Sequence, residues 1–415
     1  MKPITETIQR PSFDTTAFVG RSDETIGRSK EVNLILTKAK KLCDGEEVEK
    51  RVTVFSAETA LGKTWLLCQI AHELSIGPCP DRMKIYRLDP PDKASITDDF
   101  DATKETKRVL AEFAADVWGE KIQEVSLPEL SRKVMDVTKE RLGRYSLVLF
   151  VDAVFEADWN FLELFEEHLL GPLAIIPNVL IVLSGRGRKF PWSTPELRFR
   201  ADFHDLHPFN LDDTRVQIER LDRPGLAASD SVDVIQEIGQ GVPGATVWLV
   251  QDNDFLKTQN PETLDAILNH FLESVSAEPD NNRTKIRGYI EALCVLRAFD
   301  DDRLSKFIQV YGQATGSSVA GVAVSHGVSV NIQKILVNEA LAQYKSEEGA
   351  YILDKYLAKL AEEYLRRKNP SLWKLLHTTA IDLYAEWVTK YERTKERWIV
   401  EKAYHEGVLA SAKTD

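Results

Sequence analysis

The chain has 415 residues, of which 43% are hydrophobic and 28% charged, and it carries a formal net charge of −12. The length predicts about two to four domains, and the acidic balance argues against nucleic acid as the main partner, because phosphate backbones bind cationic faces. No apolar run reaches the ~18 residues of a membrane helix, and the start lacks the apolar core of a signal peptide, so we expect a cytoplasmic protein without a membrane partner.

The N-terminal segment is predicted to contain an extended leader and a helix before the first strand. Residues 1–25 are polar and contain two prolines, which predicts an extended leader. From 28 to 42 apolar residues recur at helical spacing, so a helix is expected there. The β-branched run at 52–56 then predicts a strand.

The segment after this strand matches the phosphate-binding pattern G-x-x-x-x-G-K-[ST] in all but its first position. With the residue that follows, it reads Ala57, Glu58, Thr59, Ala60, Leu61, Gly62, Lys63, Thr64 and Trp65. In such loops backbone N–H groups wrap the phosphates, the lysine reaches the terminal oxygens and the hydroxyl holds Mg²⁺. Ala57 replaces the first glycine, which costs strain only if the loop needs a positive φ there. Nucleotide binding is the leading hypothesis, and a chance G-K-T tripeptide before a helix is the alternative.

Further strands alternate with helices. Apolar runs at 83–88, 145–152 and 178–184 predict three strands, with helices expected at 104–118, 128–142 and 159–170 between them. Unbroken apolar runs are typical of strands buried on both faces of a parallel sheet. The alternation predicts a doubly wound α/β domain that ends near residue 207.

Charged residues follow two of these strands. Phosphoryl transfer needs Mg²⁺ held by the loop hydroxyl and by a carboxylate at a neighbouring strand end, so Thr64 and Asp152 are the predicted metal ligands. Glu156 and Asp158 lie on the next loop; either orients the attacking water or simply caps the following helix, and Glu156 is our catalytic candidate. Arg186 follows the strand at 178–184 and can neutralise charge on the transferred phosphoryl group, unless it belongs to a solvated basic loop.

The C-terminal half is mainly helical. Residues 212–275 show only helical patterns, with prolines at the segment boundaries. Two alternating strands, 340–344 and 350–353, flank a charged turn that ends in glycine and follow two or three short helices, which predicts a winged-helix unit. From residue 354 onward the pattern is helical again.

The four cysteines form no recognisable site. Cys43, Cys68, Cys79 and Cys294 show neither a C-x-x-C pair nor a histidine at metal-ligand spacing. We therefore expect no zinc site and no disulfide framework, but reduced and mostly buried thiols.

The order of these elements resembles a STAND-type P-loop NTPase, the signal-transduction class that includes NACHT and NB-ARC switches. Residues 18–24 resemble the family's F-V-G-R-x-x-E entry motif, whose backbone lies against adenine, and 150–152 resemble its Walker B strand. Residues 181–186 are similar to the strand-plus-arginine sensor, 241–243 to the G-x-P motif that places a proline against the base, and 401–407 to a first helical repeat. The resemblance thus adds the nucleotide contacts Val19, Gly20, Arg21 and Pro243.

The resemblance implies a multidomain protein: an α/β P-loop NTPase core with a parallel sheet, followed by helical lid, winged-helix and C-terminal α-helical domains. The expected limits are a leader at 1–25, the NTPase domain at 26–207, the lid at 208–278, the winged helix at 279–354 and a repeat-like helical region at 355–415. In the family the later domains close over ADP at rest and swing away when ATP and a signal arrive, which permits oligomerisation. ATP/ADP and Mg²⁺ are the implied cofactors, and effector or sensor proteins the implied partners, as in bacterial signalling or defence.

Three departures from the family pattern bear on catalysis. Ala57 replaces a loop glycine, Ala153 replaces a second acid after the metal carboxylate, and 353–355 stand where the family often has a histidine. They affect hydrolysis more than binding, so slow or no ATP turnover is expected. One alternative is a transcription regulator whose winged helix binds DNA under nucleotide control, although the segment 331–335 offers a single lysine. Another is a nucleotide-free pseudo-NTPase scaffold.

Overall fold

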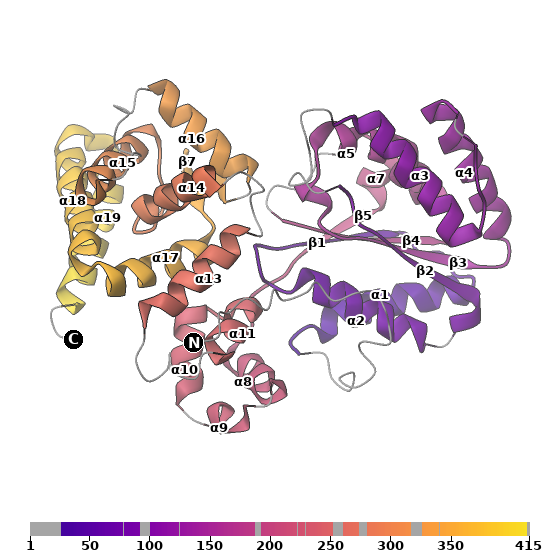
Figure 1. Cartoon of the computed structure of the whole chain (residues 1–415), viewed down its shortest axis with the longest axis horizontal. Helices are drawn as coiled ribbons and strands as arrows, with labels where there is room; N and C mark the ends of the chain where they lie inside the picture. The colour runs from indigo at the N-terminus through magenta and orange to yellow at the C-terminus, as the bar shows by residue number, and fades with distance from the viewer. Residues whose placement is uncertain are drawn as a thin grey trace. The chain divides into compact units, whose positions relative to one another are not determined.

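The computed structural model describes residues 26–412 except 78, 92–99, 124, 187–191, 222, 229, 252–259, 274–279, 317–325 and 340 (Figure 1). The chain divides into two compact units, 1–220 and 221–415. The finer domain limits given above stay predictions. Among the described residues no helix combines the length and the apolar character needed to cross a membrane.

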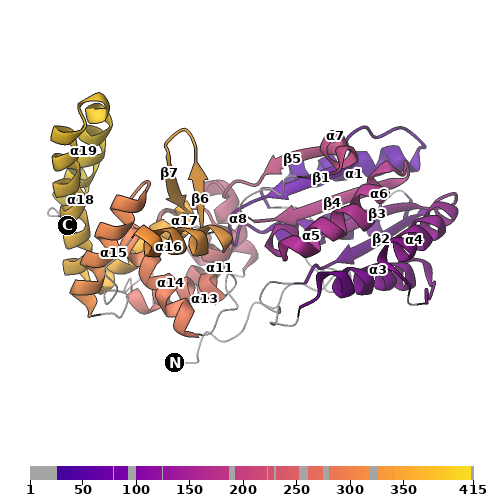
Figure 2. The same ribbon diagram turned by 90° about the horizontal axis from the view of Figure 1, so that it is seen from above.

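A parallel five-stranded sheet forms the centre of the first unit. Its strands are β1 Val52–Ser56, β2 Met83–Leu88, β3 Ser146–Val151, β4 Val179–Gly185 and β5 Ala201–Asp205. Their order across the sheet is β2-β3-β4-β1-β5, which Figure 2 shows from above. The strand before the phosphate loop, β1, is thus separated by β4 from β3, the strand that ends at Asp152. Because every pairing is parallel, the carboxyl ends of all five strands meet at one edge.

Helices cover both faces of this sheet, as the unbroken apolar runs of its strands predicted. On one face lie α1 Ser29–Cys43 and α2 Lys63–Ser75; on the other lie α3 Ala102–Trp118, α4 Leu127–Arg141, α5 Trp159–Phe165 and α6 Gly171–Ile175. The larger core joins the second group of helices to β1, β3 and β4 through fully buried side chains such as Phe113, Leu149 and Ile181. The predicted helix at 159–170 runs on to Ile175 through a π-helical turn, Glu166–Leu170. The predicted α/β core with a parallel sheet is confirmed.

The fifth strand, β5, is absent from the sequence expectations, as is the short helix α7 Pro195–Arg200 before it. The strand reads Ala-Asp-Phe-His-Asp and lies at the edge of the described sheet, where it pairs with β1, with Ala201 beside Val52. An edge strand is half covered, so its sequence lacks the unbroken apolar run that marks β3 and β4. Because aspartate is uncommon in strands, the two aspartates of β5 kept the sequence pattern from predicting a strand here.

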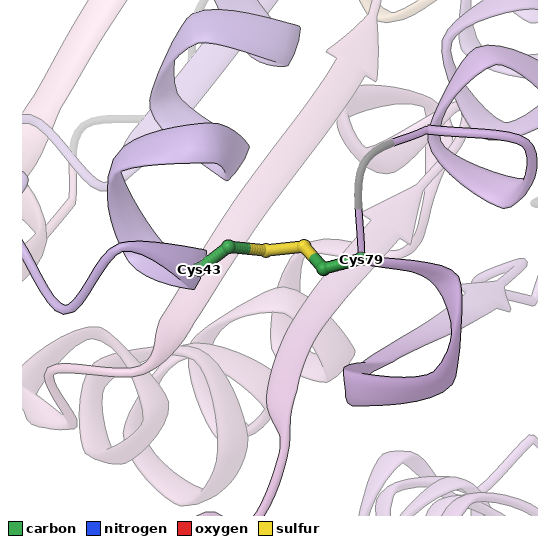
Figure 3. The surroundings of a disulfide bond; sticks show 2 residues. All are labelled: Cys43 and Cys79. Carbon is green, nitrogen blue, oxygen red and sulfur yellow. A yellow bond between two sulfur atoms is a disulfide. The ribbon is translucent and has the colours of Figure 1, made fainter.

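Cys43 and Cys79 form a disulfide, so the expectation of four reduced thiols is wrong (Figure 3). Cys43 ends α1, and Cys79 lies between α2 and the 3₁₀ turn Pro80–Arg82 before β2. Because α1 packs beside α2, the C-terminal end of α1 lies close to the segment that follows α2, and the Cα atoms of Cys43 and Cys79 are 6.7 Å apart. Their sequence separation of 36 matches no cysteine motif. Cys68 and Cys294 are free and buried, as expected.

The second unit begins after α8 Leu211–Arg220, and the residues of it that the structure describes form helices and one hairpin. Its helices are α9 Pro224–Ala227, α10 Ser231–Gly239, α11 Pro243–Gln251, α13 Pro261–Glu273, α14 Asp280–Leu293, α15 Asp301–Thr315, α16 His326–Asn338, α17 Lys355–Lys368, α18 Pro370–Lys390 and α19 Lys395–Ser411. The antiparallel strands β6 Ala342–Lys345 and β7 Ala350–Leu353 follow α16, and Tyr351 also pairs with Phe299 between α14 and α15. Three helices followed by this hairpin confirm the predicted winged helix.

The helices α18 and α19 pack against this winged helix around one buried cation. The Arg303 guanidinium of α15 is 2% exposed and lies 5.5 Å from the ring centres of both Trp387 and Trp398. It also pairs with Asp300 at 2.9 Å, and Tyr384 stacks on Trp398. Tyr384, Trp387 and Trp398 therefore form core contacts, whereas Tyr391 and Tyr404 are each 38% exposed.

A buried histidine pair joins α18 to α19. The Nδ1 atoms of His377 and His405 lie 2.8 Å apart, and both rings are fully buried. Glu362 lies 3.4 Å from the Nε2 atom of His377, and the charge of Arg297 also acts on His405. Burial, reinforced by His377, lowers the pKa of His405 to about 3.

This shift predicts acid sensitivity of the second unit. Between about pH 6.5 and pH 3, His405 is protonated in the unfolded chain but neutral in the folded chain. The free energy of unfolding should therefore fall with decreasing pH, by up to about 1.4 kcal/mol per pH unit from this group. Denaturant titrations at several pH values would measure the slope, and His405→Gln should flatten it. Equal slopes in the two proteins would contradict the assignment.

Candidate nucleotide-binding site

The loop between β1 and α2 has the backbone of a phosphate-binding turn. Ala60 and Gly62 have φ values of 60° and 83°, and α2 starts directly after Gly62, which offers no side chain to cap it. A helix N-terminus of this kind, preceded by left-handed residues, directs N–H groups at an anion. Among the described residues other than glycine, positive φ values occur at Ala60, Ala153 and Gln240, not at Ala57. The methyl group of Ala57 is therefore compatible with the loop.

Two cationic side chains donate hydrogen bonds to backbone carbonyls of this loop. Lys63 donates from Nζ to the carbonyl oxygens of Ala57 and Glu58, at 2.9 Å each, so its ammonium group lies across the start of the loop. Arg28, just before α1, donates from Nη2 to the carbonyl of Leu61 at 3.0 Å. Sequence reasoning missed Arg28, because nothing in the chain marks an arginine that precedes a helix as a loop contact.

Asp152 lies at the end of β3 among four hydrogen-bond donors and is 2% exposed. The Thr64 hydroxyl donates to its Oδ2 atom at 2.7 Å, and Arg87 Nη2 donates to the same oxygen at 3.2 Å. Its Oδ1 atom accepts from the hydroxyl of Ser184 on β4 and from the N–H of Ala153 at 3.0 Å. The structure thus brings the predicted pair Thr64 and Asp152 together, and it adds Arg87 and Ser184, which sequence reasoning missed.

This pair fits a magnesium ion. A hydroxyl and a carboxylate oxygen are hard ligands, and they lie 2.7 Å apart beside the loop. In the part of the chain that the structure describes, no cluster of three or more His, Cys, Asp or Glu could hold a metal ion without outside ligands. Mg²⁺ typically binds through one or two protein oxygens together with phosphate and water, which is the mode these residues allow.

Glu156 and Arg186 contact each other. The N–H of Arg186 donates to Glu156 Oε2 at 3.1 Å, and the Arg186 Nε atom lies 4.0 Å from Glu156 Oε1. Arg186 also donates from Nη1 to the hydroxyl of Thr59 in the phosphate loop at 3.1 Å. At 8% exposure Arg186 is not part of a solvated basic loop. Asp158 caps α5 by accepting from the N–H of Phe161, which was the structural alternative for that residue.

The structure does not test the remaining predicted contacts. Val19, Gly20 and Arg21 fall outside the described residues. Pro243 is the first residue of α11, in the second unit. Trp65 is the third residue of α2 and has 51% of its surface exposed, whereas Leu61 is buried and offers only its backbone. Their roles at a nucleotide stay predictions.

The arrangement suits polyphosphate binding more than rapid hydrolysis. Loop N–H groups, Lys63, Thr64 and Arg186 supply donors and positive charge at one sheet edge. Glu156 accepts from the Arg186 backbone, and Ala153 stands where a second acid would follow Asp152.

A scan against protein-family models finds no match, and neither does a search of curated proteins. Among solved structures the chain is similar to the ORC1 protein of Aeropyrum pernix in complex with DNA, at 13% identity over 85% of this chain and 95% of that chain, with a TM-score of 0.46. It is also similar to the ORC2 protein of Aeropyrum pernix (ADPNP-ADP complexes), at 13% identity over 84% and 96%, with a TM-score of 0.44. A RuvB mutant of Thermotoga maritima has 14% identity over 80% and 94%, with a TM-score of 0.36. The strand order and phosphate loop of this chain give its first unit the fold of a P-loop NTPase.

Proposed function

We propose that this protein is a STAND-type molecular switch that binds ATP and ADP and couples its nucleotide state to assembly with other proteins. The observation that carries the proposal is the 2.7 Å contact between the Thr64 hydroxyl and Asp152, directly beside the lysine-bearing loop. A chance G-K-T tripeptide would not place its hydroxyl on the carboxylate of a strand 88 positions away.

Each group has a distinct task in this proposal. The loop N–H groups and Lys63 bind the phosphates, and Thr64 and Asp152 hold Mg²⁺, which supplies positive charge to the phosphate oxygens when bound. Arg186 lies beside the loop at Thr59, where it meets the terminal phosphate. Val19, Gly20, Arg21 and Pro243 contact the adenine, as the family resemblance implies.

Turnover of ATP is slow in this proposal. Ala153 provides no acid at the position after Asp152, and Glu156 accepts a hydrogen bond from the Arg186 N–H. The nucleotide therefore persists long enough to act as a signal. The switch acts with effector or sensor proteins, forms a homo-oligomer on activation, and serves signalling or defence.

The winged helix gives little support to a DNA-binding role. Its turn carries Glu347 and Glu348, and the guanidinium of Arg397 on α19 donates to the carbonyl of Glu348 at 3.0 Å. An acidic turn that is already bound to another helix is unsuited to a phosphate backbone.

Nucleotide titration tests the proposal. We expect the wild-type protein to bind ATP and ADP and to gain thermal stability, equivalent to about 2.7 kcal/mol at a hundredfold excess over Kd. Lys63→Met should weaken binding at least about a hundredfold, because it removes the charge that contacts the terminal phosphates. Lys133→Met, at an exposed lysine of α4 that pairs with Glu129, is the matched control and should bind normally.

Two outcomes would sink this proposal separately. If wild-type protein binds neither nucleotide, the empty-scaffold alternative replaces it. If nucleotide binds but light scattering shows the same assembly state with ATP, with ADP and in Lys63→Met, the protein binds nucleotide without acting as a switch.

A further inference from the structure

The guanidinium of Arg87 is nearly buried and contacts the carboxylate of Asp152, the predicted metal ligand. Its Nη2 atom lies 3.2 Å from Asp152 Oδ2, the same oxygen that accepts from the Thr64 hydroxyl. The side chain of Arg87 is 10% exposed and that of Asp152 is 3% exposed. The Nε atom of Arg87 contacts Asp89 Oδ1 at 2.7 Å, and Asp89 is half exposed.

The sheet places Arg87 there. β2 pairs with β3 in parallel register, with Arg87 beside Phe150 and Leu88 beside Val151. The carboxyl ends of the two strands are therefore level, and a long side chain from the end of β2 reaches the residue that follows β3.

A magnesium ion and this guanidinium compete for one oxygen. A divalent ion bound at Asp152 Oδ2 would lie within a few ångströms of a fixed positive charge, in a site with little water to screen the repulsion. Asp89 offers Arg87 a second carboxylate, close enough to keep the guanidinium paired when it leaves Asp152.

We propose that Arg87 is a positioning residue that competes with Mg²⁺ for Asp152, so that the wild-type protein binds nucleotide with weak dependence on Mg²⁺. Asp89 weakens this competition, because its carboxylate also pairs with Arg87 and keeps the guanidinium from binding Asp152 alone. This inference rests on the proposed nucleotide site and concerns how that site is regulated.

Opposite shifts are expected from two variants. The affinity of a fluorescent ADP analogue, N-methylanthraniloyl-ADP, is measured across a Mg²⁺ series. In Arg87→Met the half-effective Mg²⁺ concentration should fall about tenfold, because the competing charge is gone. In Asp89→Asn it should rise severalfold, because Arg87 then pairs with Asp152 alone. Arg87→Lys should lie close to wild type, and Arg108→Met, a surface arginine of α3 paired with Glu105 and Glu112, should not shift.

The outcomes separate the two proposals. If all variants bind the analogue with the wild-type Mg²⁺ dependence, or if Arg87→Met weakens binding equally at every Mg²⁺ concentration, Arg87 is structural and the inference is overturned while the nucleotide site stands. If wild-type protein binds no analogue with or without Mg²⁺, both proposals fall. Should Arg87→Met fail to fold, the half-exposed Asp89→Asn decides: an unchanged Mg²⁺ dependence overturns the inference.

Discussion

Reducing the Cys43–Cys79 disulfide is expected to lower the unfolding free energy of the first unit by about 4 kcal/mol, through the loop-closure entropy of a cross-link at a sequence separation of 36. For a unit of this size the thermal midpoint should fall by about 10 °C. The enclosed segment contains β1, the whole phosphate loop and α2. Loss of the cross-link thus destabilises the part of the chain that holds the candidate site.

Calorimetry with and without a phosphine reductant measures this effect. Cys79 lines a cavity of about 390 Å³ beside the C-terminal ends of α1 and α2, which gives a small reductant access. The double variant Cys43→Ser/Cys79→Ser should match the reduced wild type and ignore the reductant. A midpoint in wild type that reductant leaves unchanged, despite full thiol titration, would refute the prediction.

Replacing Gly185 by alanine should cost about 3 kcal/mol and weaken nucleotide binding. A Cβ atom at this position would lie 2.2 Å from Cδ2, 2.7 Å from Cγ and 3.0 Å from Cβ of Phe155. Rotation about the Cβ–Cγ bond moves neither Cβ nor Cγ, so we expect the turn Val154–Glu156 to shift together with the Phe155 side chain. That shift breaks the hydrogen bond from the Arg186 N–H to Glu156.

A double-mutant cycle separates this clash from other effects. Phe155→Ala in the Gly185→Ala background should restore at least about half of the lost stability, measured by denaturant titration. Gly143→Ala is the matched control in the same unit, because its added Cβ would meet only the Glu140 carbonyl at an ordinary 3.5 Å. Additive effects of the two substitutions would show that Gly185 and Phe155 do not conflict.

The sequence alone predicted the central strands and the phosphate loop because their signals are local. β3 and β4 are buried on both faces and therefore read as unbroken apolar runs, and the loop motif fixes the order strand, turn, helix. The wing hairpin was equally visible from its alternation and its charged turn. The acid at the end of β3 could be paired with Thr64 because parallel strands end at one edge.

Contacts that depend on strand order could not be predicted in this way. Arg87 reaches Asp152 only because β2 lies beside β3, and Ser184 reaches it only because β4 lies on the other side of β3. Cys43 meets Cys79 because two helices pack side by side. Apart from Ser184, which falls within the sensor-like segment 181–186, these residues belong to no spaced motif, since the fold rather than the chain brings them together.

The position of Arg303 has a practical consequence for the limits of the winged helix. Its guanidinium is enclosed by two tryptophans from α18 and α19. A protein truncated after Lys368, before α18, would expose this cation and the apolar surface around it, with Asp300 as its nearest partner. The last two helices are therefore part of the folding unit, and a winged-helix fragment expressed without them should be insoluble.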